Sequence, residues 1–416
     1  MRKAMLFIAC CSMMALLSTN LDPEEMTKAT SFIVCLGGDS EDHGYFVQQD
    51  EDGGYIITGS TKPTRDVESD MLLAKINPQG DLVWKRTYGT KYEDVGRCVK
   101  RTRDGGYIVV GYAGYHYSLE SDKRKRSPYV VKTDSQGKAN WEKIFDKLSN
   151  DDSEGRGVIQ SRDESFIIAG DSDGYPSVIK IDSKGNVLWE KALKDNDGFA
   201  RSVEYANDDS CLIAGIGGPS YDDSFVALIG SEGQVMWRKI YKGSKTLNAY
   251  SVNVYSVQKT ADNGFILGGE TSAKYLKEYD LYLAKIDKDG ELQWEKQYGD
   301  KGEEKGYEIL QAQNTRDGGY VIVGMTSGSF EGKGRDIYLV KTDEKGDVNW
   351  TRSYDFSSND VGACVQQTMD GGFIVIGTTF AGEMSRNNII LIKTDSEGKV
   401  ENPMVKNIRI HPKKGR

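Results

Sequence analysis

Five acidic residues recur along the chain just ahead of an apolar segment, and their carboxylates are the first candidates for chemistry. If they meet around one opening, they could form a ring that holds Ca²⁺ or another hard cation through oxygen ligands. Acids in such positions also accept backbone N–H bonds within the turn, and this structural role is the competing interpretation. The five are Asp42, Asp94, Asp197, Glu304 and Asp360.

Signals for catalysis are scarce. The chain has only three histidines and contains neither a G-x-S-x-G nor an H-E-x-x-H motif. It also lacks the haem-attachment pattern C-x-x-C-H. One aromatic cluster, Tyr115, His116 and Tyr117, lies in the longest variable loop that we expect, residues 113–127, and is a second candidate for ligand binding. The alternative for such a loop is a solvated connection without a partner.

Seven copies of one turn-and-strand pattern place these candidates in repeated units. The clearest copies are DGGYIITGS (52–60), DGGYIVVGY (104–112), DGGYVIVGM (317–325) and DGGFIVIGT (370–378). Asp52 and Asp370 are separated by six intervals over 318 residues, a mean of about 53. Each copy is a glycine turn followed by four or five apolar residues, which indicates a strand buried on both faces.

A second element, K-x-D-x-x-G-x-x-x-W, follows most copies, as in KIDSKGNVLW (180–189). Its aspartate is expected to cap its own turn. In the seventh unit the tryptophan position holds Asn402, followed by Pro403, so a fourth strand is missing there. The start of the chain supplies the matching segment, with Phe32 in the tryptophan position. Every tryptophan of the chain occupies this position, which we expect to pack between units: Trp84, Trp141, Trp189, Trp237, Trp294 and Trp350.

Each unit therefore reads as four strands joined by short glycine turns, the sequence signature of a propeller blade. We predict an all-β, seven-bladed β-propeller of four-stranded antiparallel blades over residues 30–402. Residues 30–37 complete blade seven and close the ring, which hides the exposed sheet edges. Residues 403–416 are expected to form a basic, flexible tail.

These motifs resemble those of secreted bacterial and archaeal β-propeller-repeat proteins and, more distantly, quinoprotein-like propellers with tryptophan-docking motifs. The D-x-x-G-x-x-x-W run is the most specific part of the resemblance. It implies a fold in which tryptophans pack between blades, but hardly constrains function, because propellers host many activities. The sialidase-type Asp box, S-x-D-x-G-x-x-W, does not match, because both of its spacings are one residue longer here.

Residues 1–21 have the layout of a signal peptide: a cationic start followed by an apolar stretch too short for a comfortable membrane span. A lipoprotein leader at Cys10 or Cys11 is the alternative, as is a start codon at Met5 or later. We therefore expect export to the periplasm, the cell surface or the extracellular space. A membrane would be involved only through an uncleaved or lipidated leader. The four remaining cysteines have no metal-site spacing and imply no disulfide framework.

The leading hypothesis for function is a non-enzymatic propeller that presents variable loops to a protein or glycan of the cell envelope. A glycan-active hydrolase or lyase, or a degenerate quinoprotein-type enzyme, is the alternative, as is an adhesive surface protein. The net charge of −9 argues against a nucleic-acid partner. No cofactor is expected apart from the calcium option above, and we expect a monomer.

Overall fold

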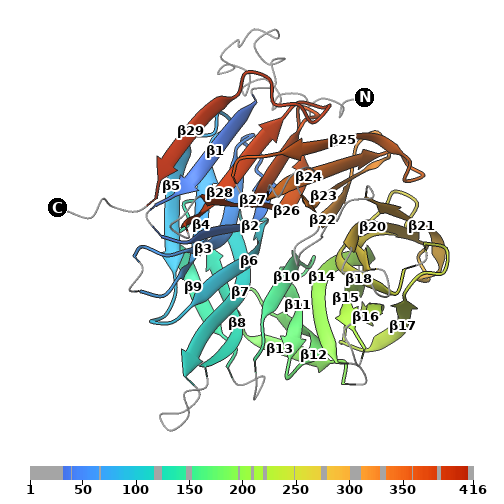
Figure 1. Cartoon of the computed structure of the whole chain (residues 1–416). Coiled ribbons are helices and arrows are strands. Elements are labelled where there is room, and N and C mark those ends of the chain that lie inside the picture. Colours follow the sequence, from blue (N-terminus) through green and yellow to red (C-terminus); the bar gives the residue numbers. More distant parts are fainter. Residues whose placement is uncertain are drawn as a thin grey trace, which may run out of the picture.

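The computed structural model describes residues 31–410, apart from 39, 65–66, 117–123, 147–151, 195–196, 208–209, 219–222, 248, 273–278, 300–310, 328–333, 358 and 382–385. Seven β-sheets follow one another around a ring (Figure 1). No helix within these ranges has the length and apolar character needed to cross a bilayer.

Six blades are four-stranded antiparallel sheets whose strands follow in chain order from the centre outward. Blade one contains β2 (Asp42–Gln49), β3 (Tyr55–Thr61), β4 (Asp70–Ile76) and β5 (Leu82–Tyr88). Blade two contains β6 (Asp94–Arg101), β7 (Tyr107–His116), β8 (Arg124–Thr133) and β9 (Ala139–Ile144). Blade three contains β10 (Gly155–Gln160), β11 (Phe166–Ser172), β12 (Tyr175–Ile181) and β13 (Val187–Ala192). Blade four contains β14 (Gly198–Asn207), β15 (Ser210–Gly217), β16 (Asp223–Gly230) and β17 (Val235–Lys242). Blade five contains β18 (Ser251–Lys259), β19 (Phe265–Ser272), β20 (Tyr279–Ile286) and β21 (Leu292–Tyr298). Blade six contains β22 (Gln311–Asn314), β23 (Tyr320–Ser327), β24 (Arg335–Thr342) and β25 (Val348–Tyr354).

Blade seven confirms the predicted closure of the ring. It contains β26 (Asp360–Gln367), β27 (Phe373–Ala381) and β28 (Arg386–Thr394), and the N-terminal strand β1 (Phe32–Gly37) adds to it antiparallel to β28. Phe32 pairs with Lys393 in the register in which Trp84 pairs with Lys75 in blade one. The prediction of a seven-bladed propeller closed by the start of the chain is therefore correct.

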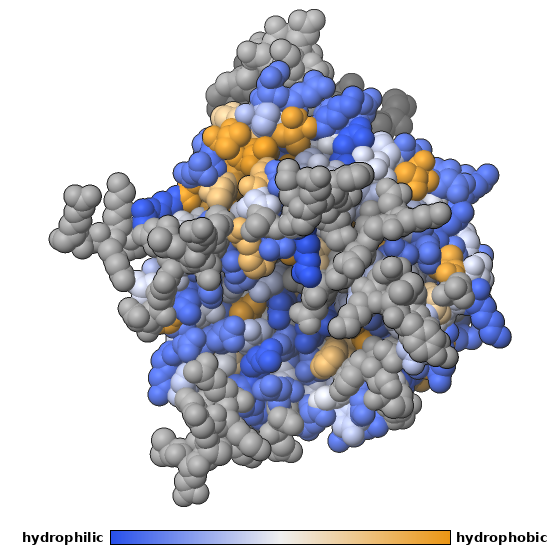
Figure 2. All heavy atoms as spheres, viewed as in Figure 1, coloured by the Kyte–Doolittle hydropathy of each residue, from blue (hydrophilic) through white to orange (hydrophobic). Residues whose placement is uncertain are grey.

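The segment just after Pro403 corrects part of the prediction that residues 403–416 form a flexible tail, and residues 411–416 lie outside the described residues. Residues Met404–Arg409 form β29, which pairs in parallel with β1 as a fifth strand of blade seven. Ile410 is buried in the core cluster that contains Phe32. Backbone hydrogen bonds hold this segment to the sheet edge: at its two ends, Met404 N–H donates to the carbonyl oxygen of Ser31 at 3.3 Å and Ile410 N–H donates to that of Gly37 at 2.9 Å. Apolar side chains gather on the surface of blade seven (Figure 2), where Val405 of β29 is 63% exposed.

The glycine and the aspartate of the K-x-D-x-x-G motif form the turn between the third and fourth strands of a blade. In the turn between β8 and β9, Asp134 Oδ1 accepts hydrogen bonds from the backbone N–H groups of Gln136 and Lys138, both at 2.9 Å. Gly137 of the same turn has φ +72°, a conformation that favours glycine. The aspartate of the K-x-D motif thus caps its own turn. The lysine of that motif instead reaches the preceding hairpin, where Lys341 pairs with Asp317 at 2.8 Å.

The tryptophans lie between neighbouring blades. Each half-buried indole packs against the turn glycine of the next blade, as Trp84 packs on Gly137. Trp189 Nε1 also donates a hydrogen bond of 2.8 Å to the carbonyl oxygen of Ser231 in the following blade. Adjacent blades are therefore fixed to one another at their outer strands, which gives the central strands a stable mutual position.

Candidate functional site at the channel mouth

The inner strands of the blades carry a repeated irregularity that creates the site. Over the part of the chain that the structure describes, one residue is skipped in the pairing with the second strand in six of these inner strands, which is a β-bulge. The extra residue is left out of the ladder. The six bulged residues and Gln311, which lines the same cavity from β22, give one residue per blade and are called the bulge ring here: Tyr45, Arg97, Arg156, Arg201, Tyr255, Gln311 and Ala363.

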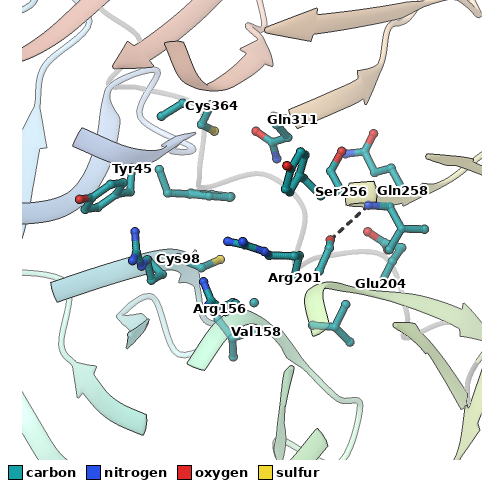
Figure 3. Close-up of a pocket in the computed structure, with 18 of the residues that line it drawn as sticks. Tyr45, Cys98, Arg156, Val158, Arg201, Glu204, Ser256, Gln258, Gln311 and Cys364 are labelled. Atoms are coloured by element: carbon teal, nitrogen blue, oxygen red, sulfur yellow. Dashed lines mark hydrogen bonds between the residues drawn. The ribbon is translucent and has the colours of Figure 1, made fainter. Parts of the chain in front are cut away.

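The bulge ring lines the central channel, where a cavity of about 120 Å³ is open. Figure 3 shows Arg201 extending from β14 across the middle of this cavity, with Arg156 beside it and Tyr45 on the opposite side. A second cavity of about 460 Å³ shares Arg97, Arg156 and Arg201 with the first. It is also lined by residues of the loops that enter the inner strands, so it forms the mouth of the channel on that face.

The bulge ring is chemically asymmetric. Its three arginines come from consecutive blades, two to four, and a tyrosine flanks them on each side, Tyr45 in blade one and Tyr255 in blade five. Among the described residues of the ring, blades six and seven contribute the neutral side chains of Gln311 and Ala363. Within the residues that the structure describes, the bulge ring therefore has a cationic side, formed by blades two to four, and an uncharged side.

Two buried carboxylates organise the arginines at the mouth. Glu154 pairs with Arg126 at 2.5 Å, with Arg156 at 3.2 Å and with Arg97 at 3.5 Å. Burial alone would raise the pKa of Glu154, but the surrounding guanidiniums, Arg156 foremost, outweigh burial and hold that pKa below its usual value. Asp171 accepts from Arg156 Nε at 3.2 Å. Burial raises the pKa of Asp171 to about 6, and the Glu154 carboxylate adds to the rise.

Aromatic rings hold the guanidinium planes in place. Arg97 lies 4.7 Å from the ring centre of Tyr45, and Arg156 lies 5.2 Å from that of Phe199. Arg201 lies between two rings, 5.7 Å from Phe199 and 5.4 Å from Tyr255. Stacking of this kind stabilises a cation and restricts its rotamers.

Residues that follow the bulges join the inner strands of neighbouring blades. Ser202 Oγ accepts the backbone N–H of Val257 at 3.2 Å, and Ser256 Oγ accepts that of Ala312 at 2.9 Å. Cys364 Sγ makes the equivalent contact with the N–H of Val47 at 3.5 Å. Burial raises the pKa of the Cys364 thiol to about 12. The thiol is therefore neutral, and its role in the channel wall is structural.

Three of the acids predicted as a ring are fully buried at the starts of inner strands. Asp42 Oδ1 accepts a hydrogen bond of 2.6 Å from Thr61 Oγ1. Asp94 accepts from the backbone and hydroxyl of Thr90, and Asp360 accepts from the backbone N–H groups of Phe356 and Ser357. Within the described residues these carboxylates line neither cavity. Ligand binding by them stays a prediction.

The other predicted residues lie apart from these three or cannot be placed. Asp197 is exposed just ahead of β14. Tyr115 and His116 end β7, paired with Lys125 and Arg124 of β8, so much of the expected loop 113–127 is an extended hairpin. Their side chains, and Tyr117 and Glu304 as a whole, lie outside the described residues.

One group of acids has a spacing compatible with a cation. Carboxylate oxygens of Asp336, Asp355 and Asp360 all lie within 4.8 Å of one another. Burial raises the pKa of Asp336, and the two neighbouring carboxylates add to the rise. Asp360 is the only one of the three that the sequence pattern singled out; Asp336 and Asp355 come from other strands and loops. Oxygen ligands of this kind would suit Ca²⁺.

Sequence reasoning did not find the bulge ring, although a signal was present. Tyr45, Arg97 and Ala363 each stand three residues after a predicted acid, in D-x-G-[YRA]. The ligand-binding ring was assigned to the acids and not to these residues, because a bulged residue cannot be recognised before the strand register is known. Arg156 and Arg201 lie in blades where the motif is degenerate.

No protein-family model matches the chain. No curated protein sequence matches it either. Among solved structures, the BP39L lectin from Burkholderia pseudomallei aligns with a TM-score of 0.55 and 10% identity over 90% of this chain and 99% of the lectin. A protein of unknown function from Dyadobacter fermentans aligns with a TM-score of 0.51 and 12% identity, over 87% of this chain and 97% of that one. The extracellular domains 1–2 of Drosophila semaphorin 1b align with a TM-score of 0.50 and 8% identity, over 88% and 86%. These likenesses show the fold alone: the chain is a seven-bladed β-propeller.

Proposed function

We propose that this chain is an exported, non-enzymatic binding propeller that holds a protein or glycan of the cell envelope at the channel mouth. The observation that carries the proposal is the constellation around Glu154, in which arginines from three blades are fixed by buried acids and aromatic rings. Polar side chains that are already held in place lose little conformational entropy when a ligand binds. These arginines lie beside an open cavity on a rigid scaffold, where binding sites of this size commonly occur.

The expected export of the chain supports the choice of partner, and residues 1–21, which carry this expectation, lie outside the described residues. The leader-like segment 1–21 favours an envelope location, and the propeller fold is shared with a lectin and a semaphorin. These neighbours support a binding role only by showing that the architecture carries one elsewhere.

Capture from envelope extracts tests the proposal. Immobilised protein should retain a partner, and a variant with segment 113–127 shortened or with Arg201→Gln should lose it, while Arg86→Gln on the outer strand β5 should retain it. The identified partner is then purified and its direct binding is measured with the same three variants. Equal direct binding to all of them would place the interaction elsewhere and contradict the proposal.

A glycan-active hydrolase or lyase is the second candidate, because one observation favours it. Asp171 has a pKa raised to about 6 and lies beside Arg156 at an open cavity, and a carboxyl group tuned toward neutral pH suits general acid–base chemistry. Release of new reducing or unsaturated ends from a polysaccharide panel, abolished by Asp171→Asn, would establish the enzyme and replace the binding proposal.

A further inference from the structure

We infer that the channel mouth binds a single carboxylate carried on a hydroxyl-rich body, which is the chemistry of a uronic acid residue. This inference rests on the proposed function and names the ligand class of that site. Its starting point is the arginine half of the bulge ring, since Arg97, Arg156 and Arg201 are neighbours that all line the channel cavity.

The charges near the buried carboxylates favour one anionic group. Four arginines, Arg97, Arg126, Arg156 and Arg201, line the mouth together with the two buried carboxylates of Glu154 and Asp171, so the inner part of the mouth carries two positive charges that these carboxylates do not balance. The other two acids of the lining, Asp152 and Asp173, lie at the rim, where Asp152 pairs with Arg126 at 3.8 Å. The fourth arginine, Arg126, is the most exposed of those that pair with Glu154. Planar guanidiniums bind carboxylates through paired N–H donors, which a lysine cannot reproduce.

Acids at the rim oppose a densely charged ligand. Asp152 is exposed and Asp173 is partly exposed, and both line the same mouth cavity. Their carboxylates would repel the closely spaced anions of a sulfated chain or of an acidic peptide. They would instead accept hydrogen bonds from hydroxyl groups. A ligand with one carboxylate directed inward and hydroxyls directed at the rim satisfies both parts of the cavity.

The space and the aromatic groups agree with this ligand. A mouth of about 460 Å³ lies within the range of roughly 300–1,000 Å³ that is usual for small-ligand pockets. Phe199 lines the mouth, and Tyr45 lines the channel just beyond it. Since the ring faces already hold Arg156 and Arg97, the guanidiniums keep their orientation when the ligand enters.

The test uses the full protein in calorimetric titrations with four probes: sodium glucuronate, aldotetraouronate (one glucuronate on xylotriose), neutral xylotetraose and a tetraglutamate peptide. Aldotetraouronate, which carries a single carboxylate, should bind at least tenfold more tightly than xylotetraose and than the peptide. If glucuronate displaces it, a single uronate fills the site; if only the tetramer binds, the source is a polymer, and both outcomes support the inference. Equal binding of the neutral sugar, or tighter binding of the peptide, would overturn it.

Variants locate the binding. Arg201→Gln should weaken aldotetraouronate binding at least tenfold, and Arg97→Lys, which keeps the charge but loses the paired donors, should weaken it several-fold. Arg86→Gln, an exposed arginine over Trp84 on β5, is the matched control and should bind as the unaltered protein does. Thermal unfolding checks that each variant is folded. Unchanged affinity in a folded Arg97→Lys or Arg201→Gln protein would remove the site from the mouth.

The outcomes distinguish a failure of the ligand assignment from a failure of the proposed binding function. If envelope capture depends on the mouth but no uronate-bearing probe binds, the binding function stands and the ligand assignment is wrong. If aldotetraouronate binds and is cleaved, the ligand assignment stands and the non-enzymatic function is wrong.

Discussion

Trp294 of blade five lies so close to Gly346 of blade six that a methyl group added to Gly346 would stand 2.9 Å from Cζ3 of the indole. The same contact recurs around the ring, with Phe32 and Gly80 taking the two roles at the closure. The glycine is therefore required twice, by its backbone conformation and by the aromatic ring above it.

A pair of alanine substitutions separates these two requirements. Gly346 has φ +78° and Gly318 has φ +84°, but nothing lies within 4 Å of a methyl group at Gly318. We expect Gly318→Ala to lower the free energy of unfolding by about 1–2 kcal/mol, the cost of the left-handed conformation. Gly346→Ala should cost about 1–3 kcal/mol more, because the indole must move. Urea denaturation measures both, and equal losses would show that the indole contact is unimportant.

Removal of an inter-blade indole should destabilise the protein far more than removal of an exposed apolar neighbour. Trp189→Ala loses ring contacts and the hydrogen bond to Ser231, so we expect a loss of about 2–4 kcal/mol, below the maximum for fully buried aromatics because the indole is only half-buried. Leu188→Ala, whose side chain is 54% exposed, should cost less than about 0.5 kcal/mol. Chemical denaturation of both variants provides the comparison, and similar values would contradict the placement of Trp189.

Shortening the chain should distinguish β29 from the residues that follow it. Deletion of 404–416 removes the parallel pairing with β1 and the buried Ile410, and we expect it to lower the free energy of unfolding by at least about 2 kcal/mol. Deletion of 411–416 alone should leave stability unchanged. The midpoints of thermal unfolding test this, and equal midpoints for the two deletions would mean that β29 contributes nothing to blade seven.

Asp94 should make stability depend on pH. Burial raises its pKa to about 7, the Asp70 carboxylate adds to the rise, and hydrogen bonds from Thr90 oppose it. The unfolded carboxyl has a pKa of about 3.9. Between about pH 4 and pH 7 the folded state therefore holds a proton that the unfolded state has released, so stability falls as pH rises through this window.

The variant Asp94→Asn removes this titration. Relative to the unaltered protein, its free energy of unfolding should rise between pH 5 and pH 8, by about 1–3 kcal/mol. Asp289→Asn, which replaces an exposed carboxylate, is the control and should show a nearly constant difference. Denaturation at several pH values measures both. A difference for Asp94→Asn that does not change with pH would mean that the carboxyl is already ionised throughout.

The fold could be predicted from the sequence because each blade repeats its own turn chemistry. Asp134 and Gly137 specify a turn without help from the rest of the chain, and the tryptophan spacing fixes the outer strand. Phe32 could be assigned to the missing position of blade seven for the same reason. β29 was missed because it continues no repeat: its residues pair with β1 only after the ring has closed.

The site could not be predicted in the same way, because it depends on contacts between blades. Glu154 is isolated in the sequence, and its importance appears only when Arg97, Arg126 and Arg156 arrive from three different strands. Arg201 becomes a channel residue because the register of β14 shifts after Ala200. A register shift is a property of the paired strands, and a local motif does not encode it.

The parallel pairing of β1 and β29 has a mechanical consequence. Phe32 lies beside Met404 and Gly37 beside Arg409, so the chain enters one strand and leaves the other at opposite ends of the same hydrogen-bond ladder. Traction on the two termini would load all of these hydrogen bonds together in shear, whereas an antiparallel pair pulled from one end would open bond by bond. Blade seven is thus built to resist stretching, and in a pulling experiment the lifetime of the folded ring under load would report the rate of rupturing this ladder.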